Sequence, residues 1–451
     1  MNKLTRRRFM QASVVSVGVA GAAGAAARAA GPLSVLTGLA PARLGANEKI
    51  RAALIGSGGM GRGDMMTFLP NKEVDFIVIC DVDDKMLAEG VKALKQARDT
   101  TPETVKDFRR IMDRKDIDIC VVGTPDHWHA LPTIHACRAN KDVYVEKPLA
   151  TSIGEGRAML DAARKYKRIV QMGTQWRSSE HWGEAVQYVQ SGKLGRIRLV
   201  RCWAYLAWVH SVGKPADEPA PAGVDYDLWL GPAPQRPFNP ARFHFSFRWF
   251  WDYAGGLMTD WGVHLLNIAL WAMGPRMPER VVSTGGKYAF DDISDTPDTQ
   301  YALYDYGNYT LVWEHQMEGG HGADGREHGV AFHGSEGTLI VDTGGWEVTP
   351  AAKDKKTAAE KPALPAEKHP SKGDGRPAHV RNFLDCVRSR KQPVENLELG
   401  HFVSTAAHLG NLALRTGQAI KWDHDKQQVV GREVPAEFIT RPYRSPWKLE
   451  V

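Results

Sequence analysis

A glycine-rich turn between a predicted strand and a predicted helix constrains the fold of this chain more than any other feature. The apolar run 50–55 is predicted to be a short buried strand, and Gly56, Gly58 and Gly61 follow it with the spacing G-x-G-x-x-G. A helix is expected from there, and Asp81 ends the next apolar run. Dinucleotide binding requires this context, because the glycines let the backbone approach a pyrophosphate at a helix N-terminus.

The same segment predicts which dinucleotide binds. Asp81 would bond the ribose hydroxyls and repel a 2′-phosphate, so NAD is expected rather than NADP. The cofactor-binding residues predicted in this segment are Gly56, Gly58, Gly59, Met60, Gly61 and Asp81.

The alternation of elements predicts an α/β fold with two domains. Strand-like and helix-like runs alternate over 49–175, which is typical of a doubly wound parallel sheet, the Rossmann architecture. From residue 176 to 425 strand-like runs follow one another with few helices between them, so an α/β domain with an open, mainly antiparallel sheet is expected. Residues 31–48 are predicted to be a linker and 426–451 a C-terminal tail.

The first 30 residues have the composition of an export signal. A basic start precedes a weakly apolar stretch rich in Gly and Ala, and "ARA" at 27–29 fits a cleavage site. The paired arginines within "TRRRFM" match a twin-arginine signal, with an ordinary Sec signal as the alternative. A periplasmic or otherwise exported protein is therefore expected, without a stable membrane anchor, because the segment is too short and too mild to span a bilayer.

Charge and cysteine content exclude several kinds of partner. The formal net charge is +6, but five basic residues and no acid precede residue 30, which leaves +1 for the rest of the chain. This gives no electrostatic case for nucleic acid or an anionic membrane. The five cysteines form no CxxC pair and no disulfide framework, so they are expected to be small buried apolar residues.

A mostly apolar helix carries a polar pair. Apolar residues recur at helical spacing over 255–273, and the run stops at Gly274. Asp260 and His264 are four residues apart, so they are expected on one side of this helix. These residues alone leave three interpretations open: a satisfied polar pair, two ligands of a metal site, or a carboxylate beside a histidine that acts as acid or base.

Two further motifs complete a family pattern. The sequences "TPDHWH" at 124–129 and "EKP" at 146–148 follow predicted strands of the first domain, at the edge where such sheets bind ligands. With the glycine-rich turn and the helix of Asp260 and His264, their order and spacing resemble the Gfo/Idh/MocA oxidoreductase family. The resemblance covers about residues 48 to 425. It implies a Rossmann domain followed by an α/β domain whose open sheet forms the far wall of the site.

The resemblance also implies the catalytic residues, Lys147, Asp260 and His264. The histidine would take the proton of a substrate hydroxyl while hydride leaves the same carbon, and Lys147 would stabilise the developing alkoxide. Asp260 would hold the second ring nitrogen of His264 or tune the pair electrostatically. No third zinc ligand is evident, so no metal is expected. The further cofactor-binding residues that the resemblance implies are Thr124, Pro125, His129, Glu146 and Lys147.

The chain departs from the family pattern in places that bear on the substrate. Asp126 stands where the family often has Asn, and Asn267 where it often has an acid. Residues 207–253 are interpreted as an insertion that covers or lines the site. Nine of the fourteen tryptophans lie between residues 176 and 271, which favours stacking on sugar rings, although large aromatic residues also fill cores. The candidate substrate-binding residues are Gln175, Trp176, Arg177, His210 and His379, with His244 as a further polar candidate.

Together these observations predict an exported NAD-dependent oxidoreductase that acts on a hydroxyl of a sugar or glycoside and recycles a tightly bound cofactor in the site. One alternative is a glycoside hydrolase that works by oxidation, elimination, water addition and reduction. Another is a non-catalytic nucleotide-binding or assembly protein. The expected partner is a small carbohydrate and not nucleic acid, and a homo-oligomer through the open sheet is a further hypothesis.

Overall fold

The computed structural model describes residues 48–352, 364–431 and 433–451. The predicted signal peptide, and the linker up to residue 47, lie outside the described residues. Within the described part, no helix is long and apolar enough to cross a membrane. The two predicted domains pack together inside one structural unit, residues 41–451.

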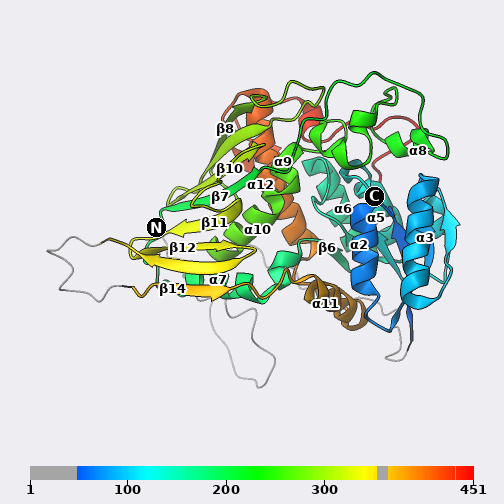
Figure 1. Ribbon diagram of the computed structural model, residues 1–451, viewed down its shortest axis with the longest axis horizontal. Coiled ribbons are helices and arrows are strands. Elements are labelled where there is room, and N and C mark those ends of the chain that lie inside the picture. Colours follow the sequence, from blue (N-terminus) through cyan, green and yellow to red (C-terminus); the bar gives the residue numbers. More distant parts are fainter. Residues whose placement is uncertain (1–47, 353–363, 432) are drawn as a thin grey trace, which may run out of the picture. The chain divides into compact units, whose positions relative to one another are not determined.

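The first domain is a doubly wound parallel sheet, as predicted, with strand order β3-β2-β1-β4-β5-β6 (Figure 1). Alternate residues of β1 face two separate apolar cores: Ala52 and Leu54 enter one, Ala53 and Ile55 the other. The strand order reverses between β1 and β4, and ligands bind beyond the carboxyl ends of strands at such a point. The strands are β1 Ile50–Ile55, β2 Val74–Cys80, β3 Glu103–Val105, β4 Ile119–Val122, β5 Asp142–Val145 and β6 Val170–Met172. The helices are α2 Gly59–Phe68, α3 Asp84–Arg98, α4 Arg109–Met112, α5 Ala130–Arg138 and α6 Ile153–Tyr166, with the short 3₁₀ helix η2 Asp126–Trp128.

The second domain contains the open, mainly antiparallel sheet that the sequence predicts. Eight strands follow the order β14-β13-β12-β11-β7-β10-β9-β8, and β7 and β10 are the one parallel pair of neighbours among these described strands. Their register runs from Leu199 opposite Thr310 to Leu206 opposite Met317. The strands are β7 Leu199–Leu206, β8 Arg280–Gly286, β9 Thr299–Asp305, β10 Thr310–Met317, β11 His328–His333, β12 Gly337–Asp342, β13 Gly345–Pro350 and β14 Glu367–Pro370. A homo-oligomer through this sheet stays a prediction.

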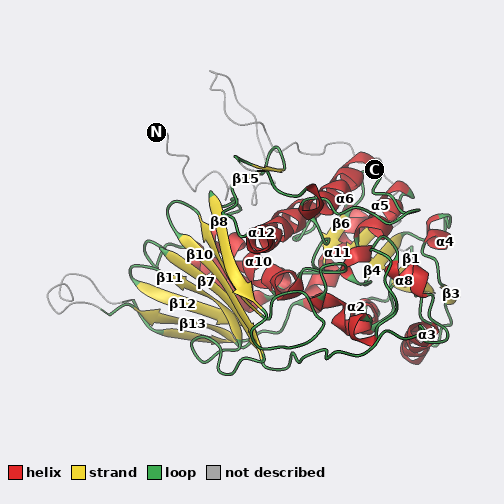
Figure 2. Cartoon of the chain, turned by 90° about the horizontal axis from the view of Figure 1, so that it is seen from above, coloured by secondary structure: helices red, strands yellow, loops and turns green. Residues whose placement is uncertain are grey.

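Helices cover one face of the large sheet (Figure 2). Large aromatic side chains fill the space between them, and Trp182, Tyr304 and Trp313 are fully buried there. The Tyr304 hydroxyl donates to the carbonyl of Ala406 in α12 at 3.1 Å. Five of the nine tryptophans between residues 176 and 271 are buried, so much of the local enrichment is core packing. The helices and shorter elements of this part are α7 Glu180–Gln190, α8 Tyr226–Leu230, α9 Gly256–Asp260, α10 Gly262–Met273, α11 Arg376–Ser389, α12 Leu397–Thr416, β15 Trp422–Asp423, β16 Gln428–Val429, η3 Gln175–Ser178, η4 Pro240–Arg242, η5 His244–Trp249 and η6 Ala436–Phe438.

The end of the chain returns to the first domain. Phe383 of α11 packs edge-on against Phe68 and Tyr144, with ring centroids 6.1 and 5.8 Å apart. In the C-terminal tail, the Trp447 ring lies 4.8 Å from that of Trp128. These contacts hold the two domains together, and Trp447 packs against Trp128 on the surface of the first domain.

The helix predicted over 255–273 is interrupted, which corrects the expectation of one continuous helix. α9 ends at Asp260 and α10 begins at Gly262, so Asp260 and His264 lie on two consecutive helices. The backbone N–H of His264 donates to the carbonyl of Trp261 at 3.1 Å, because the carbonyl of Asp260 instead accepts from Lys147 Nζ at 3.2 Å. A side chain that takes a carbonyl out of the helical ladder breaks the helix at that point.

Candidate active site

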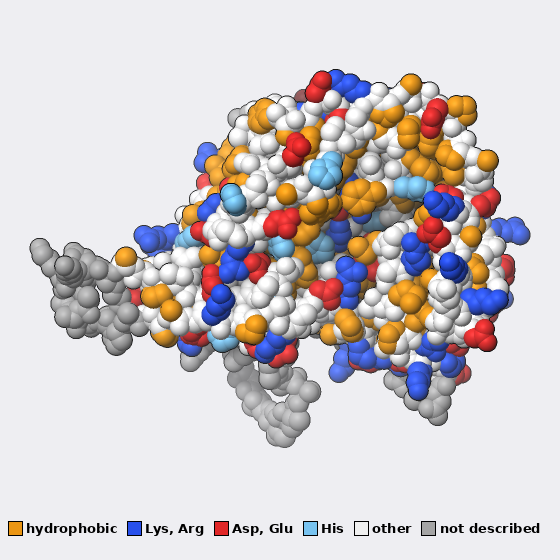
Figure 3. Space-filling view, viewed as in Figure 1, with side chains coloured by type: hydrophobic (Ala, Val, Ile, Leu, Met, Phe, Trp, Pro, Cys, Tyr) orange, Lys and Arg blue, Asp and Glu red, His pale blue; other side chains and the backbone are white. Residues whose placement is uncertain are grey.

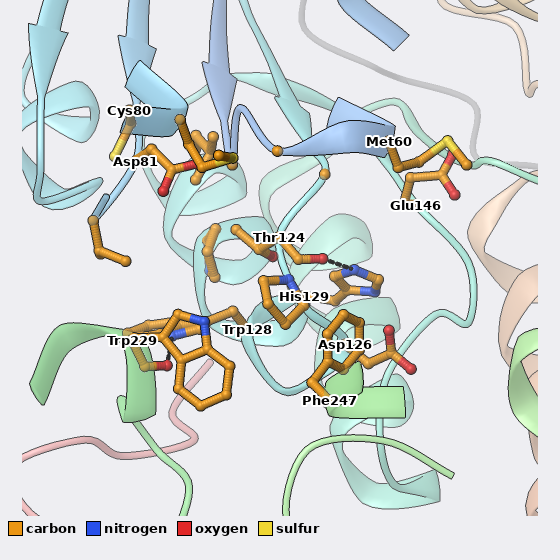
Figure 4. A pocket seen from close by; sticks show the side chains of 18 of the residues that line it. Met60, Cys80, Asp81, Thr124, Asp126, Trp128, His129, Glu146, Trp229 and Phe247 are labelled. Atoms are coloured by element: carbon orange, nitrogen blue, oxygen red, sulfur yellow. Dashed lines mark hydrogen bonds between the residues drawn. The ribbon is translucent and has the colours of Figure 1, made fainter. Parts of the chain in front are cut away.

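A cavity of about 350 Å³ opens at the carboxyl ends of the parallel strands (Figure 4). Ten of the eleven residues predicted to bind the cofactor line it, and Gly61 is the exception. The ten are Gly56, Gly58, Gly59, Met60, Asp81, Thr124, Pro125, His129, Glu146 and Lys147.

The glycines allow a close approach of backbone segments. Gly56 has a φ of +86°, and a Cβ there would lie 2.7 Å from the nitrogen of Thr124. A Cβ on Gly61 would lie 1.9 Å from the carbonyl oxygen of Gly56. Gly61 thus serves the packing of α2 on the sheet, while Gly56 and Gly58 shape the turn beside the cavity. No side chain caps the N-terminus of α2, so its backbone N–H groups are available to a pyrophosphate.

Asp81 is held at the end of β2 by the turn that it faces. Its carboxylate accepts from the Ser57 backbone at 2.7 Å and from the Asp83 backbone at 3.1 Å. Burial raises the pKa of Asp81, and the hydrogen bonds from Ser57 oppose that rise. A carboxylate fixed in this way at the cavity wall suits the hydroxyls of a ribose. The turn, the free helix end and Asp81 together fit NAD.

Lys147 makes the central contact of the site. Its Nζ donates to Asp260 Oδ1 at 2.5 Å as well as to the backbone carbonyl of that residue. Arg248 donates through Nε to the same carboxylate oxygen at 3.3 Å. Burial works against ionisation of Asp260, but the charges of Lys147 and Arg248 outweigh it and hold the pKa of the carboxyl well below its ordinary value. Asp260 is therefore ionised at neutral pH and lies between two basic side chains.

His264 is buried beside this group. Its ring lies 4.7 Å from that of Trp176, and its Nδ1 has no hydrogen-bond partner among the described residues. Burial and the neighbouring charge of Lys147 lower the pKa of His264 well below its ordinary value. The ring is therefore neutral at pH 7, which is the form that accepts a proton. Within the described residues no hydrogen bond joins Asp260 to His264, so the geometry favours the electrostatic role for Asp260 over the orienting one.

The buried carboxyl of Asp126 gives a physical account of one departure from the family pattern. Burial raises its pKa to about 8, against the opposing charges of Arg248 and Lys147. At neutral pH the group is mostly protonated, so it carries no charge and is able to donate a hydrogen bond. In both respects it resembles the Asn that the family often has at this position.

A second departure is compensated from another part of the chain. Asn267 replaces an acid on α10, and its amide donates to Glu395 at 2.9 Å. Arg177 donates to the Asn267 oxygen at 2.8 Å and lies over the ring of Trp271. A buried carboxylate therefore does reach this side of α10, but from the segment before α12.

The candidate substrate residues fall into two groups. Trp176 and Arg177 lie on η3 with Gln175, next to His264 and Asn267. By contrast, His379 is buried in α11, with its ring nitrogens 2.7 Å from Ser178 Oγ and 2.9 Å from the carbonyl of Met172. His210 is exposed. None of the five candidate residues lines the cavity, but Trp176 and Arg177 contact His264 and Asn267 of α10. The polarity of a histidine alone therefore did not predict whether it lies at the site.

The insertion over 207–253 forms one wall of the cavity. It includes the short helix α8, which contacts Trp128 of the first domain (Figure 1). Its His244 Nε2 lies 2.8 Å from Asp83 Oδ2, and its Asp225 backbone donates to the carbonyl of Val82 at 2.9 Å. Arg248 of the insertion was not among the predicted site residues. The signal for it was a basic residue inside the aromatic run "FHFSFRWF".

Two domain models of one family match the chain. The model described as "Oxidoreductase family, NAD-binding Rossmann fold" covers residues 50–174, and that of the family's C-terminal alpha/beta domain covers 195–289 and 364–449. The chain belongs to the Gfo/Idh/MocA oxidoreductase family. The predicted fold class, the NAD cofactor and the classification as an oxidoreductase are thereby confirmed.

Individual relatives match less of the chain. Levoglucosan dehydrogenase of Pseudarthrobacter phenanthrenivorans is 24% identical over 329 residues, 65% of this chain and 74% of that protein. A glycosyl hydrolase family 109 protein of Shewanella pealeana is 30% identical over 176 residues, so the match spans 37% of this chain and 38% of the hydrolase. The solved structure of levoglucosan dehydrogenase with NADH and levoglucosan superposes with a TM-score of 0.65 at 18% identity, over 83% of this chain and 99% of that one. At this identity it supports the fold alone.

Replacing His264 by Ala should lower turnover by about 10²–10⁴-fold, because a positioned proton acceptor is lost, while NAD stays bound. The measurement is the rate per folded, NAD-loaded molecule, with the exposed His321→Ala as the matched control. A second variant, Lys147→Met, removes a charge that lowers the pKa of His264, so the acid limb of its residual rate should move to higher pH. A near-normal rate in His264→Ala would remove the histidine from the chemistry.

Replacing Asp126 by Asn should leave the rate at pH 7 within a few-fold of that of the unmodified protein, because a neutral donor replaces a neutral donor. Above pH 8 the two proteins should diverge. Asp126 ionises as the pH rises through about 8, placing an anion near Asp260, whereas Asn does not titrate. The pH profile from 6 to 10 measures this. If the rate of the Asn variant changed above pH 8 in the same way as that of the unmodified protein, ionisation of Asp126 would not be the cause of that change.

Proposed function

We propose that this protein is an exported NAD-dependent oxidoreductase that acts on a hydroxyl group of a sugar or glycoside and keeps its cofactor through turnover. The observation that carries the proposal is the set of Lys147, Asp260 and His264: Lys147 lines the cofactor cavity, Asp260 accepts its hydrogen bond, and both charges act on the buried ring of His264. The similarity to levoglucosan dehydrogenase, across most of that protein, supports a sugar as the substrate.

The residues divide the chemistry between them. The glycine-rich turn, the N-terminus of α2 and Asp81 would hold NAD, which would supply hydride transfer to and from the carbon that carries the hydroxyl. Neutral His264 takes the hydroxyl proton, and the ammonium of Lys147 stabilises the negative charge that develops on the oxygen. Asp260 holds Lys147 in place at 2.5 Å and, through its charge, makes His264 a better proton acceptor.

Retention of the cofactor is supported by the way the insertion closes the cleft. Besides the bond between His244 and Asp83, the backbone of Asp84 donates to Gly223 at 3.2 Å and Lys106 donates to the same carbonyl at 2.9 Å. Two of these contacts are made by Asp83 and Asp84, which come directly after Asp81, the residue that suits the ribose. Because these contacts join the insertion to the segment beside Asp81, we expect them to hinder release of a dinucleotide, which favours recycling within the site over exchange.

A second function is favoured by a specific similarity. The match to a glycosyl hydrolase family 109 protein, although limited to 176 residues, supports a glycosidase that oxidises a ring hydroxyl, eliminates the glycosidic bond, adds water and reduces the product. The same Lys147 and His264 would move protons in each step. This cycle regenerates NAD without an external oxidant.

A glycoside panel distinguishes these functions. We expect purified protein to contain NAD, and a sugar substrate to produce the absorbance of reduced nicotinamide, up to one equivalent per site, if the protein is a dehydrogenase with a retained cofactor. Release of the aglycone with no net reduction would identify the glycosidase. The His264→Ala variant is the control for background hydrolysis. If protein with NAD demonstrably bound gave neither signal with any sugar, the non-catalytic alternative would stand.

Export by the twin-arginine route is proposed from the sequence of the first 30 residues, in particular the arginines at 6, 7 and 8. Replacing these three by Lys should leave the protein in the cytoplasm, because the route requires the arginine pair. Replacing Arg28 by Lys is the matched control and should not affect export. Cell fractionation measures both, and normal export of the triple variant would indicate another route.

A further inference from the structure

Two exposed aromatic side chains of the insertion stand together at the mouth of the cavity. Phe245 is 54% exposed and Trp208 is 44% exposed, and their ring centroids lie 6.3 Å apart in an edge-on arrangement. Phe245 also lines the cavity. Large exposed apolar groups in contact are uncommon away from binding sites. Hydrophobic side chains and histidines gather around a hollow near the middle of the face drawn in Figure 3.

Arg248 connects this pair to the catalytic centre. Its guanidinium lies 4.6 Å from the centroid of the Phe245 ring, and its Nη1 donates to the Phe245 carbonyl at 3.0 Å. Its Nε donates to Asp260, the carboxylate that also holds Lys147. One arginine head group therefore separates the exposed ring from the residues proposed to carry out the reaction.

The turn that carries Phe245 is held in place by the residues on either side of it. His244, immediately before it, has a left-handed φ of +50° and is bonded to Asp83. Phe247, two residues later, is buried and lines the cavity. Because both neighbours are held, the Phe245 ring cannot reach the core without breaking these contacts, so its exposure is built into the turn.

The pair extends beyond the cofactor cavity. Trp208 does not line the cavity, whereas Phe108 and Trp128 do. The latter two residues lie on the first domain, where the ring of Trp447 supports both from behind. Because Phe245 lines the cavity and Trp208 does not, and both are exposed, the pair continues the cavity toward solvent.

We propose that Phe245 and Trp208 form a second sugar-binding subsite, which holds a ring linked to the one that is oxidised. This deepens the proposed function and rests on it: the substrate class is a disaccharide or a larger glycoside rather than a free monosaccharide. Aromatic faces bind the apolar C–H faces of sugar rings, and the Arg248 guanidinium offers N–H donors to the hydroxyls at the ring edge.

The test is calorimetric binding of saccharides to the NAD-loaded protein. The probes are cellobiose, maltose, lactose and N,N′-diacetylchitobiose, each compared with the methyl glycoside of its non-reducing sugar. We expect at least one disaccharide to bind more tightly than its methyl glycoside. Trp208→Ala and Phe245→Ala should each weaken that disaccharide roughly 2- to 10-fold and leave the methyl glycoside unchanged. Tyr288→Ala, which removes a 72% exposed ring from another loop, is the matched control.

Several results would overturn the subsite. They are an equal loss of affinity for both ligands of a pair, release of NAD from the Trp208 variant, no advantage of any disaccharide in the unmodified protein, or a change in sedimentation with saccharide affinity intact. The last would assign the pair to contact between copies of the chain. Selective disaccharide binding without turnover would refute the proposed function and leave the subsite standing. Turnover without a preference for disaccharides would refute the subsite and leave the proposed function standing.

Discussion

The contact between Lys147 and Asp260 is the interaction on which the rest of the site depends. Lys147 follows β5 of the first domain, and its ammonium reaches both the carboxylate and the backbone carbonyl of a residue 113 positions later. Because that carbonyl is withdrawn from the helical ladder, α9 ends at Asp260 and α10 begins at Gly262, after the single residue Trp261. The contact therefore joins the two domains and also sets the start of the helix that carries His264.

The charges around this contact are arranged so that each group has a useful form at neutral pH. Two cations keep Asp260 ionised although it is buried, which an isolated buried carboxylate would not be. The same burial keeps Asp126 protonated and His264 neutral. Three titratable groups within one desolvated site thus differ in protonation because their neighbours differ. This is the pattern that proton-transfer sites require.

The insertion links the two ends of the cofactor cleft through one short turn. In η5, His244 contacts Asp83 near the ribose end, and Arg248 contacts Asp260 at the catalytic end. A displacement of this turn would loosen both contacts at once. The contact with Asp83 and the charge arrangement around Asp260 are therefore coupled by the geometry of the six residues of η5.

The sequence by itself determined the features whose physical cause is local. The spacing of Gly56, Gly58 and Gly61 records a steric requirement within a single turn, and the alternation of apolar runs follows from strands that are buried on both faces. The Rossmann domain, the open sheet and NAD binding could be predicted for this reason. Resemblance to a family supplied the expected roles of Lys147, Asp260 and His264, which the fold brings to one place.

Only the tertiary structure decided the features that depend on residues far apart in the chain. The break after Asp260 could not be read from an apolar helical pattern, because a lysine of the other domain causes it. Glu395 reaches Asn267 across 128 positions, and nothing in either local sequence indicates that contact. The sequence also could not tell which histidine lies at the site. His264 lies there, whereas both ring nitrogens of His379 are hydrogen-bonded to Ser178 and Met172. The periodicity of apolar residues determines which face of a helix or strand is buried. The hydrogen-bond or ion-pair partner of a polar side chain is determined only when the elements pack.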